Sequence, residues 1–295
     1  MAHTHSSKKY GRAFGIGIAL NSIYVAVELF YGFSVNSTAL IADAGHNASD
    51  VLSLILAWSA IWVAAKRPSA RYTYGLRKTT IMASMVNGIL IIGAAVLIAL
   101  DAIQKFQNPV DIPGNIVMIV AAIGLVVNTG TAFLFYKDQK SDLNIKGAFL
   151  HMAADAGVTL GVLLGGFAIK YTGLTWIDPA LGLIIVVVIL YSAWGLLSDS
   201  VKLALDAVPK GIDQDEVKRF LEKIDCIEEV HDLHIWAMST TETALTAHLV
   251  IPEGHDDQLL YDIREKLHEM FEISHTTLQV EKDWNDDEYR PFKNS

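Results

Sequence analysis

The stretch IDPALGLIIVVVILYSAWGLL, residues 177–197, decides the fold class of this 295-residue chain. A helix needs about 20 mostly apolar residues to cross the hydrocarbon core of a bilayer. The stretch meets that requirement with Asp178 as its one charged residue. Five more predominantly apolar stretches precede it, at residues 13–33, 38–64, 79–101, 114–136 and 146–169. The sequence therefore predicts an α-helical membrane protein with six transmembrane helices.

The composition changes near residue 200. Residues 1–200 contain 13 Lys and Arg against 10 Asp and Glu, whereas residues 201–295 contain 10 against 22. The whole chain is 52% hydrophobic and 19% charged, which excludes a disordered protein. A single cysteine, Cys226, excludes a disulfide scaffold and cysteine-cluster zinc motifs. Because the soluble part is acidic and repels phosphates, we expect no nucleic-acid partner.

Basic residues in the short loops predict the orientation, because loops rich in Lys and Arg stay on the cytoplasmic side. One set of loops and ends contains Lys8, Lys9, Arg12, Lys66, Arg67, Arg71, Arg77, Lys78, Lys137, Lys140 and Lys146, and the opposite loops contain Lys105 and Lys170. Both termini are therefore predicted to be cytoplasmic, and the expected location is the bacterial cytoplasmic (inner) membrane. The predicted organisation is a cytoplasmic N-terminal tail (1–12), a six-helix transmembrane domain (13–199), a cytoplasmic domain (200–284) and an acidic tail (285–295).

The cytoplasmic domain is predicted to be an α+β fold in the order α-β-β-α-β. Asp213 followed by Glu216 has the form of a capping box at the start of a helix. Residues 230–237 and 243–251 alternate as strands, residues 256–271 form an amphipathic helix, and residues 275–281 form a third strand. This order is compatible with a two-layer ferredoxin-like sandwich.

Two predicted spans carry the same ionisable pattern, His-x-x-x-Asp. The pairs are His46 with Asp50 and His151 with Asp155. Residues four apart lie on one face of a helix, and ionisable side chains inside a bilayer are costly enough to suggest a function. Two such faces turned toward each other present two imidazoles and two carboxylates, a tetrahedral set that suits Zn²⁺ and accommodates Cd²⁺, Co²⁺ or Fe²⁺. One copy would equally fit a helix-packing hydrogen bond, but two copies on separate spans favour a shared metal site.

Further polar residues occupy the same spans. Asp43 lies three residues before His46, and a structural hydrogen bond explains it better than an electrostatic extension of the metal site. Four more are Asn21, Glu28, Asn47 and Asn128. These either line a water-filled path or hold helices together.

The segments around the two pairs resemble the second-helix and fifth-helix motifs of the cation diffusion facilitator family. They read ALIADAGHNASD at residues 39–50 and NIKGAFLHMAAD at residues 144–155, and VHDLHIW at residues 230–236 extends the likeness into the soluble part. The resemblance implies a homodimeric metal-ion/proton antiporter. It implies that the transported ion is bound by His46, Asp50, His151 and Asp155. Histidine at the first position of the second-helix motif is the form associated with zinc and cadmium, whereas two aspartates are associated with iron or manganese.

The resemblance also implies candidate ligands for a cytoplasmic metal ion at His231, His248 and Glu281. Strand alternation places His248 and Glu281 on one face, away from the core. Strict alternation in the first strand exposes His234 instead of His231, so His231 needs a bulge or a strand end. Solvated surface histidines are the alternative interpretation.

The predicted function is export of divalent metal ions from the cytoplasm in exchange for protons by alternating access, with Zn²⁺ as the transported substrate. Expected partners are a second copy of the chain, the lipid bilayer, divalent metal ions and protons. One rival is a membrane metal sensor or scaffold with a structural intramembrane metal. The other is an intramembrane metalloenzyme, which is disfavoured because the chain lacks His-Glu-x-x-His and because four protein ligands leave no open position. We therefore expect no enzymatic activity.

Overall fold

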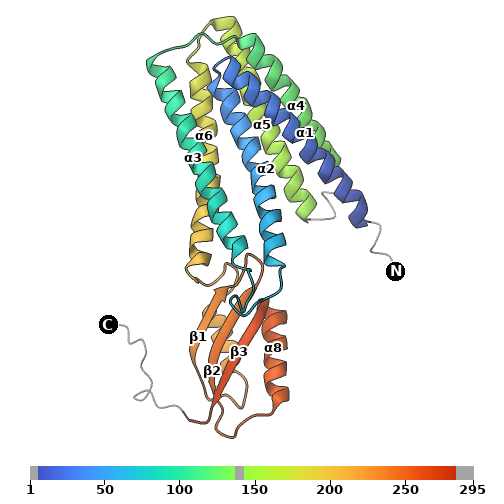
Figure 1. Ribbon diagram of the computed structural model, residues 1–295, viewed down its shortest axis with the longest axis vertical. Coiled ribbons are helices and arrows are strands. Elements are labelled where there is room, and N and C mark those ends of the chain that lie inside the picture. Colours follow the sequence, from blue (N-terminus) through green and yellow to red (C-terminus); the bar gives the residue numbers. More distant parts are fainter. Residues whose placement is uncertain (1–5, 137–142, 284–295) are drawn as a thin grey trace. The chain divides into compact units, whose positions relative to one another are not determined.

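The computed structural model describes residues 6–136 and 143–283 (Figure 1). Six long helices come first: α1 (Ser6–Ser34), α2 (Thr38–Ala64), α3 (Thr79–Gln107), α4 (Gly114–Tyr136), α5 (Leu143–Thr172) and α6 (Ile177–Ala204). Within the described residues, the five helices from α2 to α6 are long and apolar enough to cross a membrane. The predicted order of six helices and a following α+β domain is confirmed. The predicted acidic tail, 285–295, and the start of the N-terminal tail lie outside the described residues.

The chain divides into two compact units. One contains the residues up to Leu56 together with Val86–Leu197, and the other contains Ala57–Met85 together with the residues from Ser198 onward. The second unit holds α7 (Gln214–Glu222), β1 (Glu229–Ala237), β2 (Thr243–Val250), α8 (Asp257–Phe271) and β3 (Ile273–Glu281). The domain boundaries drawn from the sequence stay predictions.

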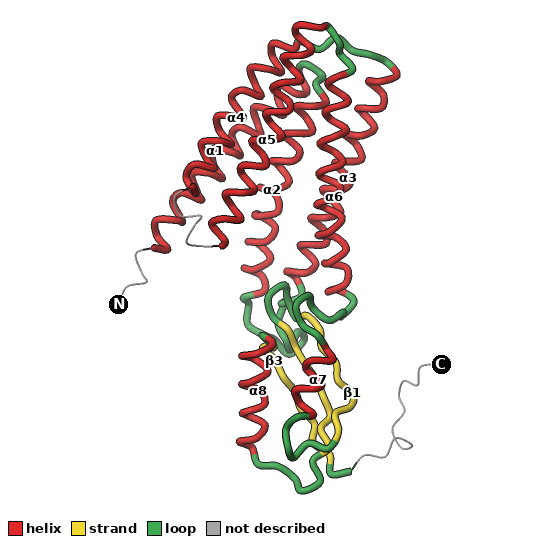
Figure 2. Tube along the Cα trace, turned by 180° about the vertical axis from the view of Figure 1, so that it is seen from behind, coloured by secondary structure: helices red, strands yellow, loops and turns green. Residues whose placement is uncertain are grey.

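Helices α4 and α5 lie side by side in both views (Figures 1 and 2) and approach closely at two glycines. A Cβ on Gly114 would lie 2.7 Å from the backbone nitrogen of Lys170, and a Cβ on Gly166 would lie 2.8 Å from that of Met118. Such distances leave no room for a side chain at either position. The two glycines therefore allow the backbones to pack directly.

An acidic side chain from α6 caps the first turn of α2. The Asp178 carboxylate accepts hydrogen bonds from the Ser37 hydroxyl (2.5 Å), the Thr38 amide (2.6 Å) and the Ala39 amide (3.4 Å). All three of Asp178, Ser37 and Thr38 are fully buried. The cap satisfies amide groups that have no partner inside the helix, and it ties the start of α2 to α6.

The α+β part of the second unit is a two-layer sandwich. Strand β1 pairs antiparallel with β2, and β2 pairs parallel with β3. Helices α7 and α8 lie on one face of the sheet, as the two opposite views show (Figures 1 and 2). The core between the layers includes Leu221, Leu245, Leu249, Ile263 and Leu267. The Asp213 carboxylate caps α7 through the amides of Asp215 and Glu216.

Candidate metal sites

The structure brings together three of the four residues predicted for the membrane site, His46, Asp50 and Asp155, and places His151 beside the two aspartates. His46 Nε2 lies 3.2 Å from Asp155 Oδ1, and His151 Nε2 lies 3.2 Å from Asp50 Oδ2. His151 Nε2 is also 3.9 Å from Asp155 Oδ2. One ligand atom each from His46, Asp50 and Asp155 lies within 4.8 Å of the others. The two 3.2 Å contacts join α2 to α5. The four-residue spacing places the histidine and the aspartate of each helix on one face, and the packing of the two helices brings these faces together.

Burial within the membrane site is graded. The Asp155 side chain is 1% exposed and that of His46 is 16% exposed, whereas Asp50 and His151 are 29% and 45% exposed. The Asp155 side of the cluster is closed by protein, and the His151 side is open.

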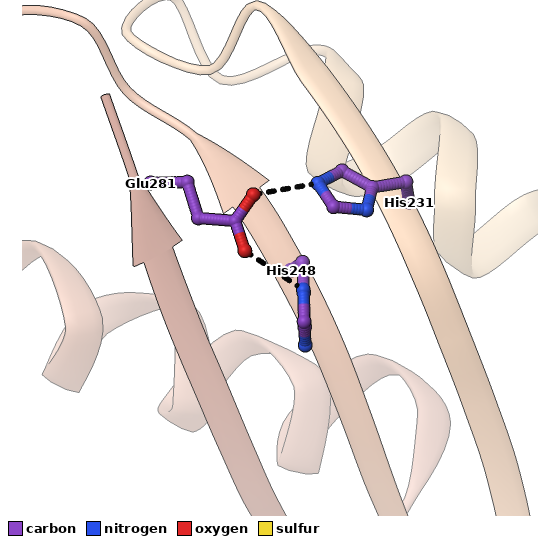
Figure 3. Close-up of side chains that lie close together, drawn as sticks. All are labelled: His231, His248 and Glu281. Atoms are coloured by element: carbon purple, nitrogen blue, oxygen red, sulfur yellow. Dashed lines mark hydrogen bonds and ion pairs between the residues drawn. The ribbon is translucent and has the colours of Figure 1, made fainter. Parts of the chain in front are cut away.

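A second cluster lies on the sheet of the α+β part (Figure 3). His231 comes from β1, His248 from β2 and Glu281 from β3. Glu281 Oε2 lies 3.1 Å from His231 Nε2, and Glu281 Oε1 lies 2.9 Å from His248 Nδ1. The three side chains are 12%, 17% and 20% exposed, in the order given above. The ligand atoms lie within 4.8 Å of one another, close enough to share one ion.

The geometry of β1 explains how His231 reaches this cluster. The register of β1 against β2 shifts between His231 and His234, and Asp232 has a φ of 49°. The predicted bulge is therefore present, and it turns His231 toward His248 while His234 stays exposed.

Sequence reasoning missed Asp232, the bulge residue itself. Its Oδ2 lies 3.6 Å from His248 Nε2 and its Oδ1 lies 3.0 Å from His234 Nε2. Asp232 thus adds a second carboxylate beside His248. The sequence shows this carboxylate directly after His231. The direction of the Asp232 side chain depends on its left-handed backbone, which strand alternation does not predict.

Comparisons with known proteins agree with this architecture. The family described as "Cation efflux transmembrane domain" matches residues 15–203, and "Cation efflux protein, cytoplasmic domain" matches residues 209–283. This chain belongs to the cation diffusion facilitator family. As a member of that family it is a transporter and not an enzyme. It is an integral membrane protein whose C-terminal domain is cytoplasmic.

Several relatives of this facilitator are similar over nearly the whole chain. The "Cadmium, cobalt and zinc/H(+)-K(+) antiporter" of Bacillus subtilis is 32% identical over 95% of this chain and 92% of its own length. "Zinc transporter ZitB" of Escherichia coli is 32% identical over 95% of this chain and 93% of its own length. "Metal cation efflux system protein CzcD" of Cupriavidus metallidurans is 31% identical, over 92% and 86%.

Proposed function

We propose that this facilitator exports Zn²⁺ from the cytoplasm in exchange for protons, by alternating access around the cluster of His46, Asp50, His151 and Asp155. The observation that carries the proposal is the meeting of the two His-x-x-x-Asp faces of α2 and α5 inside the membrane-spanning unit. The names of the relatives support a zinc, cadmium and cobalt class of substrate and an exchange with protons.

The donor atoms favour zinc within that class. Two imidazole nitrogens and two carboxylate oxygens can surround one ion, and this mixed set suits the tetrahedral preference of Zn²⁺. Cd²⁺ and Co²⁺ accept the same donors. Zinc is therefore the proposed main substrate, with cadmium and cobalt as further substrates.

The contacts between the ligands supply a reason for proton exchange. A carboxylate only accepts hydrogen bonds, so the close contacts of His46 Nε2 with Asp155 and of His151 Nε2 with Asp50 require a proton on each Nε2. A metal ion at Nε2 takes the place of that proton, which moves to Nδ1 of a neutral ring but leaves a ring that is protonated on both nitrogens. Zinc entry on one side therefore releases protons from doubly protonated rings, and proton entry on the other side releases zinc, which couples the two fluxes.

The cytoplasmic domain is proposed to join two copies of the chain and to bind zinc at His231, His248 and Glu281. The family assignment of residues 209–283 supports the homodimer. The bridging position of Glu281 between the two rings supports the metal (Figure 3). The bacterial origin of the relatives supports the inner membrane as the location.

The test is zinc flux into proteoliposomes with an acidic lumen. Transporters inserted with the cytoplasmic side outward should take up zinc while protons leave the lumen. The Asp155→Ala protein should show no such uptake, and Asp111→Asn is the matched control because Asp111 is an exposed carboxylate in the α3–α4 loop. A folded wild-type protein that binds zinc without transporting it would refute the transporter and favour the metal sensor or scaffold.

The cytoplasmic site is tested separately by counting zinc ions bound per chain. Wild type should bind one more zinc ion per chain than Glu281→Gln. The neutral amide of glutamine does not supply the negatively charged ligand that Glu281 offers between the two histidines. His234→Ala should bind as wild type does, since His234 is exposed and lies outside the group of His231, His248 and Glu281. Equal stoichiometry in wild type and Glu281→Gln would contradict this site.

A further inference from the structure

A basic cavity lies at the C-terminal end of α2, within the second unit of the chain. Its volume is about 380 Å³, inside the range of about 300–1,000 Å³ that is usual for sites of small ligands. One wall comes from the turn between β1 and β2 of the cytoplasmic domain, so the cavity lies on the cytoplasmic side of the membrane. The other walls come from the end of α2, the α2–α3 loop and the first turn of α3, and the polar lining includes Lys66, Arg67, Tyr74, Arg77, Thr80, Ser239, Thr241 and Glu242.

The α2–α3 loop folds back on the end of α2 to form this cavity. Two backbone hydrogen bonds of 3.0 and 3.1 Å close a turn between Ser69 and Tyr72, and the Gly75 amide donates a 2.9 Å hydrogen bond to the Tyr72 carbonyl. Gly75 has a φ of 77°, and a Cβ there would lie 3.5 Å from the Lys66 carbonyl oxygen. This left-handed residue returns the chain to α2, which places Arg77 in the same cavity as Lys66.

The cavity has more positive than negative charge. Arg77 is already neutralised, because its Nη1 lies 2.5 Å from Glu242 Oε1. Lys66 and Arg67 form no ion pair within residues 6–136 and 143–283. The loop from residue 65 to residue 78 contains no aspartate or glutamate that would neutralise them. Two positive charges are therefore left for an anionic ligand.

The cavity opens beside an apolar strip on α2. Trp58, Trp62 and Lys66 are spaced at intervals of four residues, and Lys66 Nζ lies 4.6 Å from the centroid of the Trp62 ring. Trp58 and Trp62 are 73% and 63% exposed, and Ile61, which also lines the cavity, is 61% exposed. Tryptophan is enriched where a helix crosses the membrane interface, and lysine at a helix end extends toward the lipid headgroups. This strip therefore offers a surface for acyl chains that leads to the basic cavity.

An anionic phospholipid matches both the charge and the strip. Lysine and arginine bind phosphate oxygens through charge-assisted hydrogen bonds. A cluster of four to eight basic residues directly after a transmembrane helix on the cytoplasmic side is typical of binding to anionic lipids. Residues 66–78 supply five: Lys66, Arg67, Arg71, Arg77 and Lys78. A free phosphate ion would use the same cations, but it would leave the exposed tryptophans of α2 without a role.

We propose that this cavity binds the phosphate headgroup of an anionic phospholipid from the cytoplasmic leaflet. Lys66 and Arg67 are the phosphate ligands, and the acyl chains lie along Trp58 and Trp62. Arg77 stays paired with Glu242 and forms part of the wall. The site contains none of the metal ligands, so the proposal does not depend on which ion the protein transports.

The test is native mass spectrometry of the purified full-length protein in detergent, titrated with phosphatidylglycerol or with phosphatidylcholine of the same acyl chains. Wild type should bind phosphatidylglycerol at least about tenfold more tightly, because only this headgroup has a net negative charge. Lys66→Gln and Arg67→Gln should each weaken that binding about fivefold, the usual effect of one basic residue on an anionic lipid. Lys66→Arg keeps the charge and should bind as wild type does.

Arg71→Gln is the matched control, because it removes the same charge from the same loop but Arg71 does not line the cavity. It should change the affinity by less than about twofold. Equal losses in Arg71→Gln, Lys66→Gln and Arg67→Gln would overturn the site and leave only a general attraction by the basic loop. Equal binding of the two lipids would also overturn it.

Inorganic phosphate distinguishes a lipid from a soluble ligand. Phosphate added at the concentration of the lipid should not displace phosphatidylglycerol, because it lacks the acyl chains that bind along α2. Displacement at that concentration would overturn the lipid assignment in favour of a free-phosphate site.

Discussion

The substitution Asp178→Ala tests how the start of α2 is held. The carboxylate accepts three hydrogen bonds, and the two short ones come from Ser37 and Thr38, which are both fully buried. Removing the acceptor leaves two donors that water cannot reach, at a cost of about 1–3 kcal/mol each. Loss of the cap to α2 is part of the same change, so the expected loss in the free energy of unfolding is about 2–6 kcal/mol.

Two further variants refine the test, one at Asp178 itself and one at an exposed control position. Asp178→Asn keeps one acceptor oxygen without the charge, so it should lose about 1–2 kcal/mol. Asp111→Ala removes an exposed carboxylate and should change stability by less than about 0.5 kcal/mol. The assay is unfolding of the full-length protein in mixed micelles with increasing SDS, followed by tryptophan fluorescence. An Asp178→Ala protein as stable as wild type would refute the argument that Asp178 anchors α2.

Three further outcomes are expected. Gly166→Ala should destabilise the protein by about 1–3 kcal/mol in the same assay, because its Cβ would lie 2.8 Å from the Met118 backbone nitrogen. The control Gly161→Ala should be neutral or slightly stabilising, because a Cβ there has no neighbour within 4 Å. Equal effects of the two substitutions would contradict direct α4–α5 packing. His46→Asp should weaken zinc binding at least about tenfold because a hard oxygen replaces imidazole, and an unchanged affinity in a zinc titration would remove His46 from the ligand set. Zinc binding to wild type should weaken as the pH falls below about 6.5, because binding needs neutral imidazoles and protonation competes for their nitrogens; titrations between about pH 5 and 8 that give one constant affinity would exclude histidine ligands.

The two clusters differ in how each is built. In the membrane site, each helix contributes one histidine and one aspartate. The site therefore stays intact only while α2 and α5 keep the rotation about their axes that turns these side chains toward each other. In the cytoplasmic site, three neighbouring strands contribute one residue each, so the sheet itself fixes the spacing. We therefore expect helix motion to change the first cluster and to leave the second one intact.

The sequence by itself determined the number and order of the elements. Long apolar runs have one stable arrangement in a bilayer, the helix, because every backbone polar group must be satisfied inside the segment. The spacing of His46 to Asp50 and of His151 to Asp155 also predicted which side chains share a face, since helical periodicity is local. The ends of the β strands were predicted to within a few residues, because the alternation of side chains along a strand is also local.

Only the tertiary structure decided which faces meet. The pairing of His46 with Asp155 and of His151 with Asp50 depends on the rotation of two helices that are far apart in the chain. The turn of His231 toward Glu281 depends on a left-handed residue in β1, and strand alternation does not encode it. Likewise, Asn21, Glu28, Asn47 and Asn128 left two interpretations open in the sequence, and the hydrogen bond of Asn128 to Thr159 appears only when α4 packs against α5. Local periodicity determines a face, whereas packing between distant segments determines its partner.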